Sequence, residues 1–104
     1  MSELKTIEFI SKRMCELFDV RKILLFGSRA NGAAKPESDY DILVIADTEL
    51  PFIERQGIAL SALTGRDFAI DLLIYTPAEA EKAASNPGSA LYWAEREGRQ
   101  VYAK

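Results

Sequence analysis

Apolar residues near the beginning of the chain recur mostly at steps of three or four residues, which is the spacing of one face of an α-helix. These residues are Leu4, Ile7, Ile10, Met14, Leu17 and Phe18. The pattern predicts an amphipathic helix from about Glu3 to Phe18. Ser2 stands where an N-cap is expected, because its hydroxyl can accept a backbone hydrogen bond.

Three later segments have the short, nearly continuous apolar character of buried strands. They are "KILLF" (Lys22–Phe26), "DILVIA" (Asp41–Ala46) and "DFAIDLLIY" (Asp67–Tyr75). Because so few of their positions are polar, we expect both faces of the sheet to be at least partly covered. The closing "QVYA" predicts a short last strand.

Capping and turn residues delimit four further helices. They are predicted at Ser28–Asn31, at Pro51–Leu63 with Gly65 as C-terminal cap, in "AEAEKAAS" after Thr76-Pro77, and at Ser89–Glu97 before Gly98. Asn86-Pro87-Gly88 separates the last two. Strands and helices in this order predict an α/β (α+β) fold, a small mixed sheet flanked by helices, in one domain spanning residues 1–104.

The composition excludes several classes of catalytic and metal-binding site. The chain has 104 residues, no histidine and one cysteine, which excludes Ser-His-Asp and Cys-His nucleophiles and histidine or thiolate zinc sites within it. Its formal net charge of −3 argues against direct nucleic-acid binding over a broad surface. The apolar runs are too short to span a membrane. With a lone cysteine and no secretory signal, we expect a cytoplasmic protein.

Two aspartates at the start of the second predicted strand are the first candidate for chemistry. Asp39 and Asp41 flank Tyr40, so their side chains point to the same face of the strand. Carboxylates that close raise each other's pKa unless a cation lies between them. Mg²⁺ or Mn²⁺ would suit, since hard cations prefer oxygen ligands. The alternative is a pair of exposed residues at a loop end.

A third aspartate interrupts the otherwise apolar run of the third strand. Asp71 is costly to bury there unless it is paired or binds a metal. If the third strand lies beside the second, Asp71 joins Asp39 and Asp41 in one acidic cluster. The alternative places it on a solvated face or beside an arginine.

The turn after the first strand is the third candidate. Gly27 permits close backbone approach to a ligand, and Ser28 offers a hydroxyl and an N–H where an anion can bind. Arg29 can bring positive charge to a phosphate. The alternative is an ordinary strand-to-helix turn, and no Lys-Ser/Thr follows Gly32 as a Walker motif requires. Together, a phosphate-binding turn and metal-binding carboxylates indicate phosphoryl chemistry.

The segment "GSRANGAAKPESDYDILV" resembles the signature of the minimal nucleotidyltransferase (MNT) domains of the polymerase-beta-like nucleotidyltransferase superfamily. That signature is Gly-Ser, a spacer, Asp-x-Asp on a strand and an aspartate on a later strand. The resemblance extends over nearly the whole chain, and Asn31 departs from it, since a second basic residue is common there. The matching residues are Gly27, Ser28, Arg29, Ser38, Asp39, Asp41 and Asp71.

The resemblance implies a role for each matching site residue. Asp39 and Asp41 would bind both of two Mg²⁺ (or Mn²⁺) ions. Asp71 would ligate the catalytic ion and help to deprotonate the incoming hydroxyl. Gly27 and Ser28 would hold the β- and γ-phosphates of ATP, with Arg29 as a weaker candidate.

The resemblance also implies a partner. Small members of this family typically pair with a helical HEPN ribonuclease toxin and act as antitoxins that transfer AMP from ATP to a toxin tyrosine. This implies AMPylation of the toxin, and the chain would form a hetero-oligomer or a homo-oligomer. Two alternatives stay open: a non-catalytic antitoxin that masks the toxin, and a nucleotidyltransferase for a small molecule such as an aminoglycoside.

Tyr92-Trp93, in the last predicted helix, has two interpretations. Aromatic residues are common anchors in interfaces, which would make the pair part of a partner-binding patch. The alternative is that the pair packs the helix onto the sheet.

Overall fold

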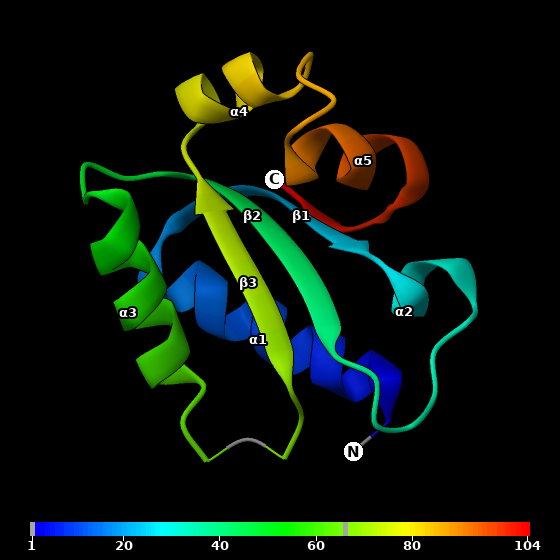
Figure 1. The fold of residues 1–104 in the computed structure, drawn as a ribbon. Helices are drawn as coiled ribbons and strands as arrows, with labels where there is room; N and C mark the ends of the chain where they lie inside the picture. Colours follow the sequence, from blue (N-terminus) through cyan, green and yellow to red (C-terminus); the bar gives the residue numbers. More distant parts are fainter. Residues whose placement is uncertain (1, 66) are drawn as a thin grey trace.

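The computed structural model describes residues 2–65 and 67–104, and its elements follow the predicted order (Figure 1). They are α1 (Glu3–Leu17), β1 (Asp19–Phe26), α2 (Ser28–Asn31), β2 (Tyr40–Asp47), α3 (Phe52–Ala62), β3 (Ile70–Tyr75), α4 (Pro77–Ala83), α5 (Ala90–Glu97) and β4 (Arg99–Ala103). The predicted fold class, a mixed sheet flanked by helices, is confirmed.

Local capping signals were good guides to the helix ends. Ser2 caps α1 by accepting a hydrogen bond from the Lys5 N–H, and Gly98 is the C-cap of α5. Thr76 and Glu79 form a capping box at the start of α4, in which each side chain satisfies a backbone N–H of the other. These ends depend on only a few neighbouring residues, and so the sequence alone predicts them.

Three predicted boundaries were wrong by a few residues. β1 begins at Asp19 rather than Lys22, because Asp19 pairs with Asp47 at the far end of β2. β3 begins at Ile70 rather than Asp67, because its pairing with β2 starts there. α3 ends at Ala62 with Leu63 as C-cap, and Gly65 lies in the turn beyond it with φ +85°.

The sheet has the order β3-β2-β1-β4. β2 and β3 are parallel, and β1 is antiparallel to both β2 and β4. The beginnings of β2 and β3 therefore lie beside the end of β1, where these three strands end on the same side of the sheet. The Gly27-Ser28 turn, the Asp39/Asp41 pair and Asp71, which the sequence indicated separately, come together at these strand ends.

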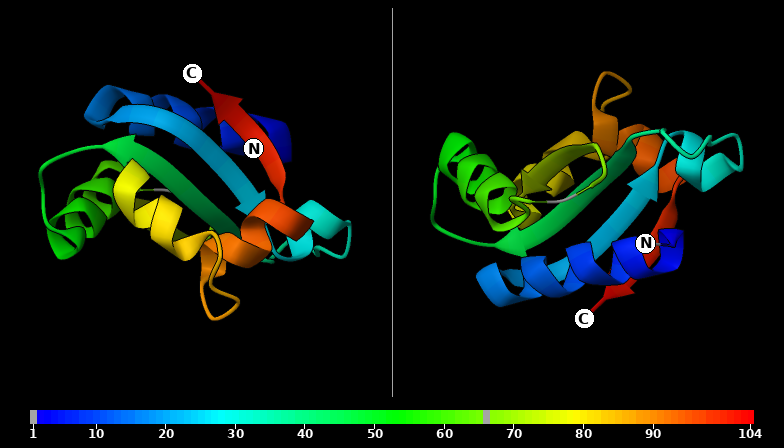
Figure 2. Two further views of the ribbon diagram at one scale, coloured as in Figure 1. Left: turned by 90° about the horizontal axis from the view of Figure 1, so that it is seen from above. Right: turned by 90° about the horizontal axis from the view of Figure 1, so that it is seen from below.

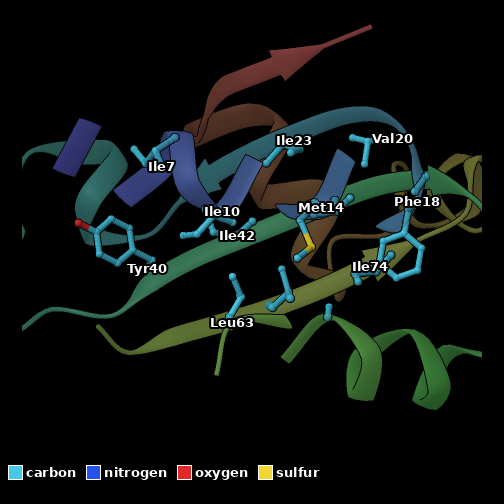
Figure 3. Close-up of a cluster of buried hydrophobic side chains, with 14 of the residues drawn as sticks. Ile7, Ile10, Met14, Phe18, Val20, Ile23, Tyr40, Ile42, Leu63 and Ile74 are labelled. Carbon is cyan, nitrogen blue, oxygen red and sulfur yellow. The ribbon is translucent and has the colours of Figure 1, made fainter. Parts of the chain in front are cut away.

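Helices cover both faces of the sheet, as predicted (Figure 2). α1 lies on one face over a core that α3 also helps to form, and Ile10, Met14 and Ile42 are buried there (Figure 3). α4 and α5 lie on the other face, where Leu43, Leu91 and other apolar residues are buried. Within the described part of the chain, none of these helices is both long and apolar enough to cross a membrane.

A buried arginine joins α3, β3 and α4. Arg55 is only 5% exposed, and it donates to the carbonyls of Leu50 at 2.7 Å and Ile74 at 3.1 Å. Its guanidinium also binds both carboxylate oxygens of Glu79, at 2.7 and 3.1 Å. This hydrogen bonding is the largest cause that lowers the pKa of Glu79. A charge this deeply buried requires its partner.

We predict that Glu79→Gln lowers the free energy of unfolding at neutral pH by about 1 kcal/mol, a modest value because the Glu79 side chain is partly solvated. Glutamine can keep the capping box, so the substitution isolates the charge. Thermal unfolding should show a melting temperature lower by about 4–8 °C.

The same variant has a pH signature. Because the pKa of Glu79 is lower in the folded state, its stabilisation is present at neutral pH and is lost as the pH falls from the usual value of 4.5 through the folded pKa. The difference between wild type and Glu79→Gln should shrink across that window. Glu81→Gln, at an exposed glutamate of the same helix, is the control. A pH-independent difference would contradict this account.

Candidate active site

The strand register brings two of the predicted aspartates together. Asp41 of β2 stands opposite Asp71 of β3 in the parallel ladder. Asp41 alternates with Leu43 and Ile45, which are buried beneath α4 and α5, so it belongs to that face of the sheet. Asp71 belongs to the same face and is exposed. The condition under which the sequence predicted an acidic cluster is therefore met for this pair.

Negative charge accumulates at Asp41 without local compensation. Its pKa is raised, first by burial and then by the charges of Asp71 and Asp39. Within residues 2–65 and 67–104, none of the three carboxylates has a hydrogen bond or an ion pair to another side chain. A group of this kind attracts a cation.

The three aspartates have the right ligand atoms for a metal ion, but their side chains are not gathered around one point. The three side chains offer only carboxylate oxygens, the ligands that Mg²⁺ and Mn²⁺ prefer. Asp39 lies just before β2 and is exposed. In the described part of the chain, no three carboxylate, thiolate or imidazole side chains are gathered closely enough to hold a metal. The donor set thus suits a hard cation, although the three carboxylates do not converge as they stand.

Gly27 lies directly against Asp41. Its φ of +72° belongs to the left-handed region that side chains disfavour. A Cβ atom at this position would also overlap Oδ2 of Asp41. Both the backbone conformation and the close approach therefore require glycine, and they fix the turn before Ser28 beside the carboxylate. Ser28 begins α2, whose first turn leaves N–H groups without partners inside the helix.

Arg29 is engaged with the loop between α2 and β2. Its guanidinium donates to the carbonyls of Ser38, at 2.7 and 3.1 Å, and of Pro36, at 3.1 Å. It lies 4.0 Å from the centre of the Tyr40 ring and forms an ion pair with Glu3 at 3.3 Å. Tyr40 is buried on the α1 face. These contacts favour a role in holding the loop before Asp39, and the expected phosphate contact of Arg29 stays a prediction.

A cavity that the sequence did not predict lies beside the Gly27 turn. It has a volume of about 260 Å³ and is lined by Phe26, Gly27, Asn31, Trp93 and Glu97. Trp93 and Glu97 come from α5, far along the chain, and only the packing of α5 against β1 brings them here. A cavity of about 550 Å³ between Arg29, Tyr40 and Phe68 contains none of the three aspartates.

Known structures share this fold. The chain is similar to the crystal structure of a toxin–antitoxin with AMP-PNP, with a TM-score of 0.68 and 24% identity over 94% of this chain and 73% of that one. It is also similar to a putative nucleotidyltransferase from Sulfolobus solfataricus, with a TM-score of 0.68 and 19% identity over 97% and 80%.

A third similar structure is a tri-AMPylated Shewanella oneidensis HEPN toxin in complex with MNT antitoxin. Its TM-score is 0.52, with 20% identity over 94% of this chain and 73% of that one. Identities this low show the fold alone. No curated protein sequence matches the chain.

The family assignment rests on a separate comparison, a match to a family model. The model of the nucleotidyltransferase domain matches residues 7–86, which is most of the chain. The matched part contains the Gly27 turn, Asp39, Asp41 and Asp71, which lie at neighbouring strand ends. The chain belongs to the nucleotidyltransferase domain family.

Proposed function

We propose that this protein transfers AMP from ATP to a tyrosine hydroxyl of a cognate HEPN ribonuclease toxin and thereby acts as its antitoxin. The observation that carries the proposal is the pairing of Asp41 with Asp71, beside the Gly27-Ser28 turn. The similar structures that contain AMP-PNP or an AMPylated HEPN toxin support it.

The carboxylates account for metal dependence. Asp39 and Asp41 would hold two Mg²⁺ (or Mn²⁺) ions, with Asp71 as a further ligand of one. When bound, such ions stabilise the charge on the attacking and leaving oxygens. The raised pKa of Asp41 is consistent with this role, because a cation would relieve the repulsion that raises it.

The turn would bind the nucleotide on the other side of Asp41. In our proposal, the backbone of Gly27 and the N–H and hydroxyl of Ser28 bind the β- and γ-phosphates. Because Gly27 touches the Asp41 carboxylate, phosphates at the turn would place the α-phosphorus near the aspartates. Arg29 would contribute by fixing the Ser38 carbonyl next to Asp39.

The transfer is a single displacement at phosphorus. The tyrosine oxygen attacks the α-phosphorus of ATP and forms a new P–O bond. The bond from the α-phosphorus to the oxygen bridging to the β-phosphate breaks, and pyrophosphate leaves. The hydroxyl proton passes to the carboxylate of Asp71, which is exposed and accessible to an incoming side chain.

We predict that intact-protein mass spectrometry will detect this reaction. The protein encoded beside this chain would be incubated with it, ATP and Mg²⁺. It should gain mass in steps of one AMP, and it should gain none with Asp39→Asn/Asp41→Asn. A stable complex with both versions but no mass gain would favour the masking antitoxin. Neither complex nor gain would favour a small-molecule acceptor.

Asp41→Asn also separates loss of activity from loss of structure. The folded state raises the pKa of Asp41, so the ionised carboxylate destabilises the fold at pH values above the folded pKa. Asparagine removes that charge at similar size. We therefore expect a higher melting temperature than wild type at neutral pH together with lost transfer. A lower melting temperature would contradict the electrostatic account.

Asp71→Asn tests the proton acceptor. Transfer should fall about 10²- to 10⁴-fold, the usual contribution of general base catalysis, while ATP affinity changes little. Single-turnover transfer and equilibrium ATP binding would be measured on the same preparation. Equal losses in both would show that Asp71 acts in binding rather than at the attacking oxygen.

Gly27→Ala tests the contact between the turn and Asp41. Strain at positive φ and overlap with Oδ2 should together destabilise the fold by about 1–3 kcal/mol and abolish transfer. Gly32→Ala is the matched control, because Gly32 has φ +81° but open space around a Cβ. It should show the strain alone and keep transfer. Equal effects of the two substitutions on transfer would exclude a special role for the Asp41 contact.

A further inference from the structure

An apolar stripe lies open to solvent along α3. Ile53, in the first turn, is 82% exposed, the highest value for a large apolar side chain in the described part of the chain. Gly57 and Leu60 follow it at steps of four and three residues, so the three share one face of the helix, and both are exposed. Because the outward face of a surface helix is ordinarily polar, this stripe indicates a contact with another surface.

Gly57 supports the same interpretation. A Cβ atom at this position would meet no other atom within 4 Å, and its φ is not among the positive values of the chain. No contact of this position within the described structure therefore requires glycine, although glycine inside a helix is destabilising relative to alanine. The missing side chain flattens α3 next to Ile53 and permits another backbone to come close.

A groove adjoins Ile53. It has a volume of about 330 Å³ and lies between the first turn of α3 and α4. The rings of Phe52 and Tyr75 line it, with their centroids 6.5 Å apart, and Glu79 in its wall is held by the buried Arg55. The groove is therefore already formed, and it can take a single aliphatic side chain. Because Ile53 directly follows Phe52, the exposed isoleucine lies beside this groove.

Opposite charges accompany the two features. Glu54 follows Ile53, whereas Lys82 lines the groove. Both side chains are exposed, and neither has a hydrogen bond or an ion pair to another side chain among residues 2–65 and 67–104. A projecting apolar residue with a negative charge thus lies beside a groove with a positive charge. These are the two halves of a contact that complements itself across a twofold axis.

We propose that this surface binds a second copy of the chain in a twofold-symmetric dimer. Ile53 of each copy enters the groove between Phe52 and Tyr75 of the other copy. Glu54 of each copy pairs with Lys82 of the other. An apolar anchor in a pocket, with charges at the rim, is the usual composition of a protein interface.

A dimer of this form leaves the candidate active site open. Tyr75 ends β3, whereas Asp71 lies near its beginning, about 13 Å away for four residues of extended strand. In Figure 1, α4 and the beginning of α3 lie at the arrowhead end of β3. The dimer goes beyond the proposed function and does not depend on it, because none of its contact residues belongs to the nucleotide or metal site.

Sedimentation equilibrium over a range of protein concentrations measures the dimer directly. Wild type should dimerise, and Ile53→Asp should weaken association by at least about 100-fold, because each dimer loses two anchors and gains two charges in its grooves. Leu4→Asp is the matched control, since Leu4 is also strongly exposed but lies on α1, and it should dimerise as wild type does. Equal melting temperatures of the variants at low concentration would show that each one is folded.

Charge reversal tests the pairing itself. Glu54→Lys and Lys82→Glu should each weaken the dimer about tenfold, because each creates two pairs of like charge. The double variant Glu54→Lys/Lys82→Glu restores opposite charges and should dimerise as wild type does. A mixture of the two single variants should form heterodimers, since each variant then meets its complement.

The outcomes separate the possible occupants of the surface. A wild-type chain that stays monomeric at about 1 mM, or Ile53→Asp that dimerises like wild type, would overturn the dimer. A double variant no better than the single ones would overturn the pairing of Glu54 with Lys82. If the chain is monomeric and Ile53→Asp instead abolishes binding of the protein encoded beside it, the surface belongs to that protein. AMP transfer by Ile53→Asp should persist, so loss of the dimer is distinguishable from failure of the proposed function.

Discussion

The register of β2 with its two neighbours is the constraint on which the candidate site depends. One residue, Asp41, stands opposite Phe26 on one side and Asp71 on the other. A slip of one residue in either pairing would turn Asp41 towards the other face. The register is secured because β2 is buried on both faces, with Ile42 and Val44 towards α1 and Leu43 and Ile45 towards α4 and α5. Packing along the strand thereby sets the positions of charges at its end.

The site works against the stability of the fold that holds it. Burial and two neighbouring carboxylates all disfavour the ionised form of Asp41, and Gly27 occupies a conformation that other residues avoid. Arg55 has the opposite effect, because its guanidinium ties α3, β3 and α4 together away from the aspartates. The chain thus places a satisfied buried charge where structure is needed and unsatisfied charges where a ligand is proposed. Such an arrangement is typical of functional sites.

The helices, the strands and the candidate aspartates could be predicted from the sequence because their signals are local. Ser2, Thr76 and Gly98 act on backbone groups within a few residues, and a lone carboxylate in an apolar strand is visible in the sequence. The pairing of Asp41 with Asp71 could only be stated conditionally, since it depends on which strands are neighbours. The loop contacts of Arg29 were not foreseen, because a charge in a motif does not show where its side chain points. Nor was the cavity at Trp93, which exists only after α5 packs on β1.

The geometry has a consequence for the kind of acceptor. The proposed donor side of the site is built from fixed groups, the turn at Gly27 and the Asp41 carboxylate against it. On the proposed acceptor side, Asp71 is exposed at the beginning of an edge strand. An acceptor must be oriented as it approaches there, because orientation is a large part of catalysis. A hydroxyl carried by a folded partner arrives already oriented by the partner's own surface. The exposure of Asp71 is therefore consistent with the protein acceptor that we propose.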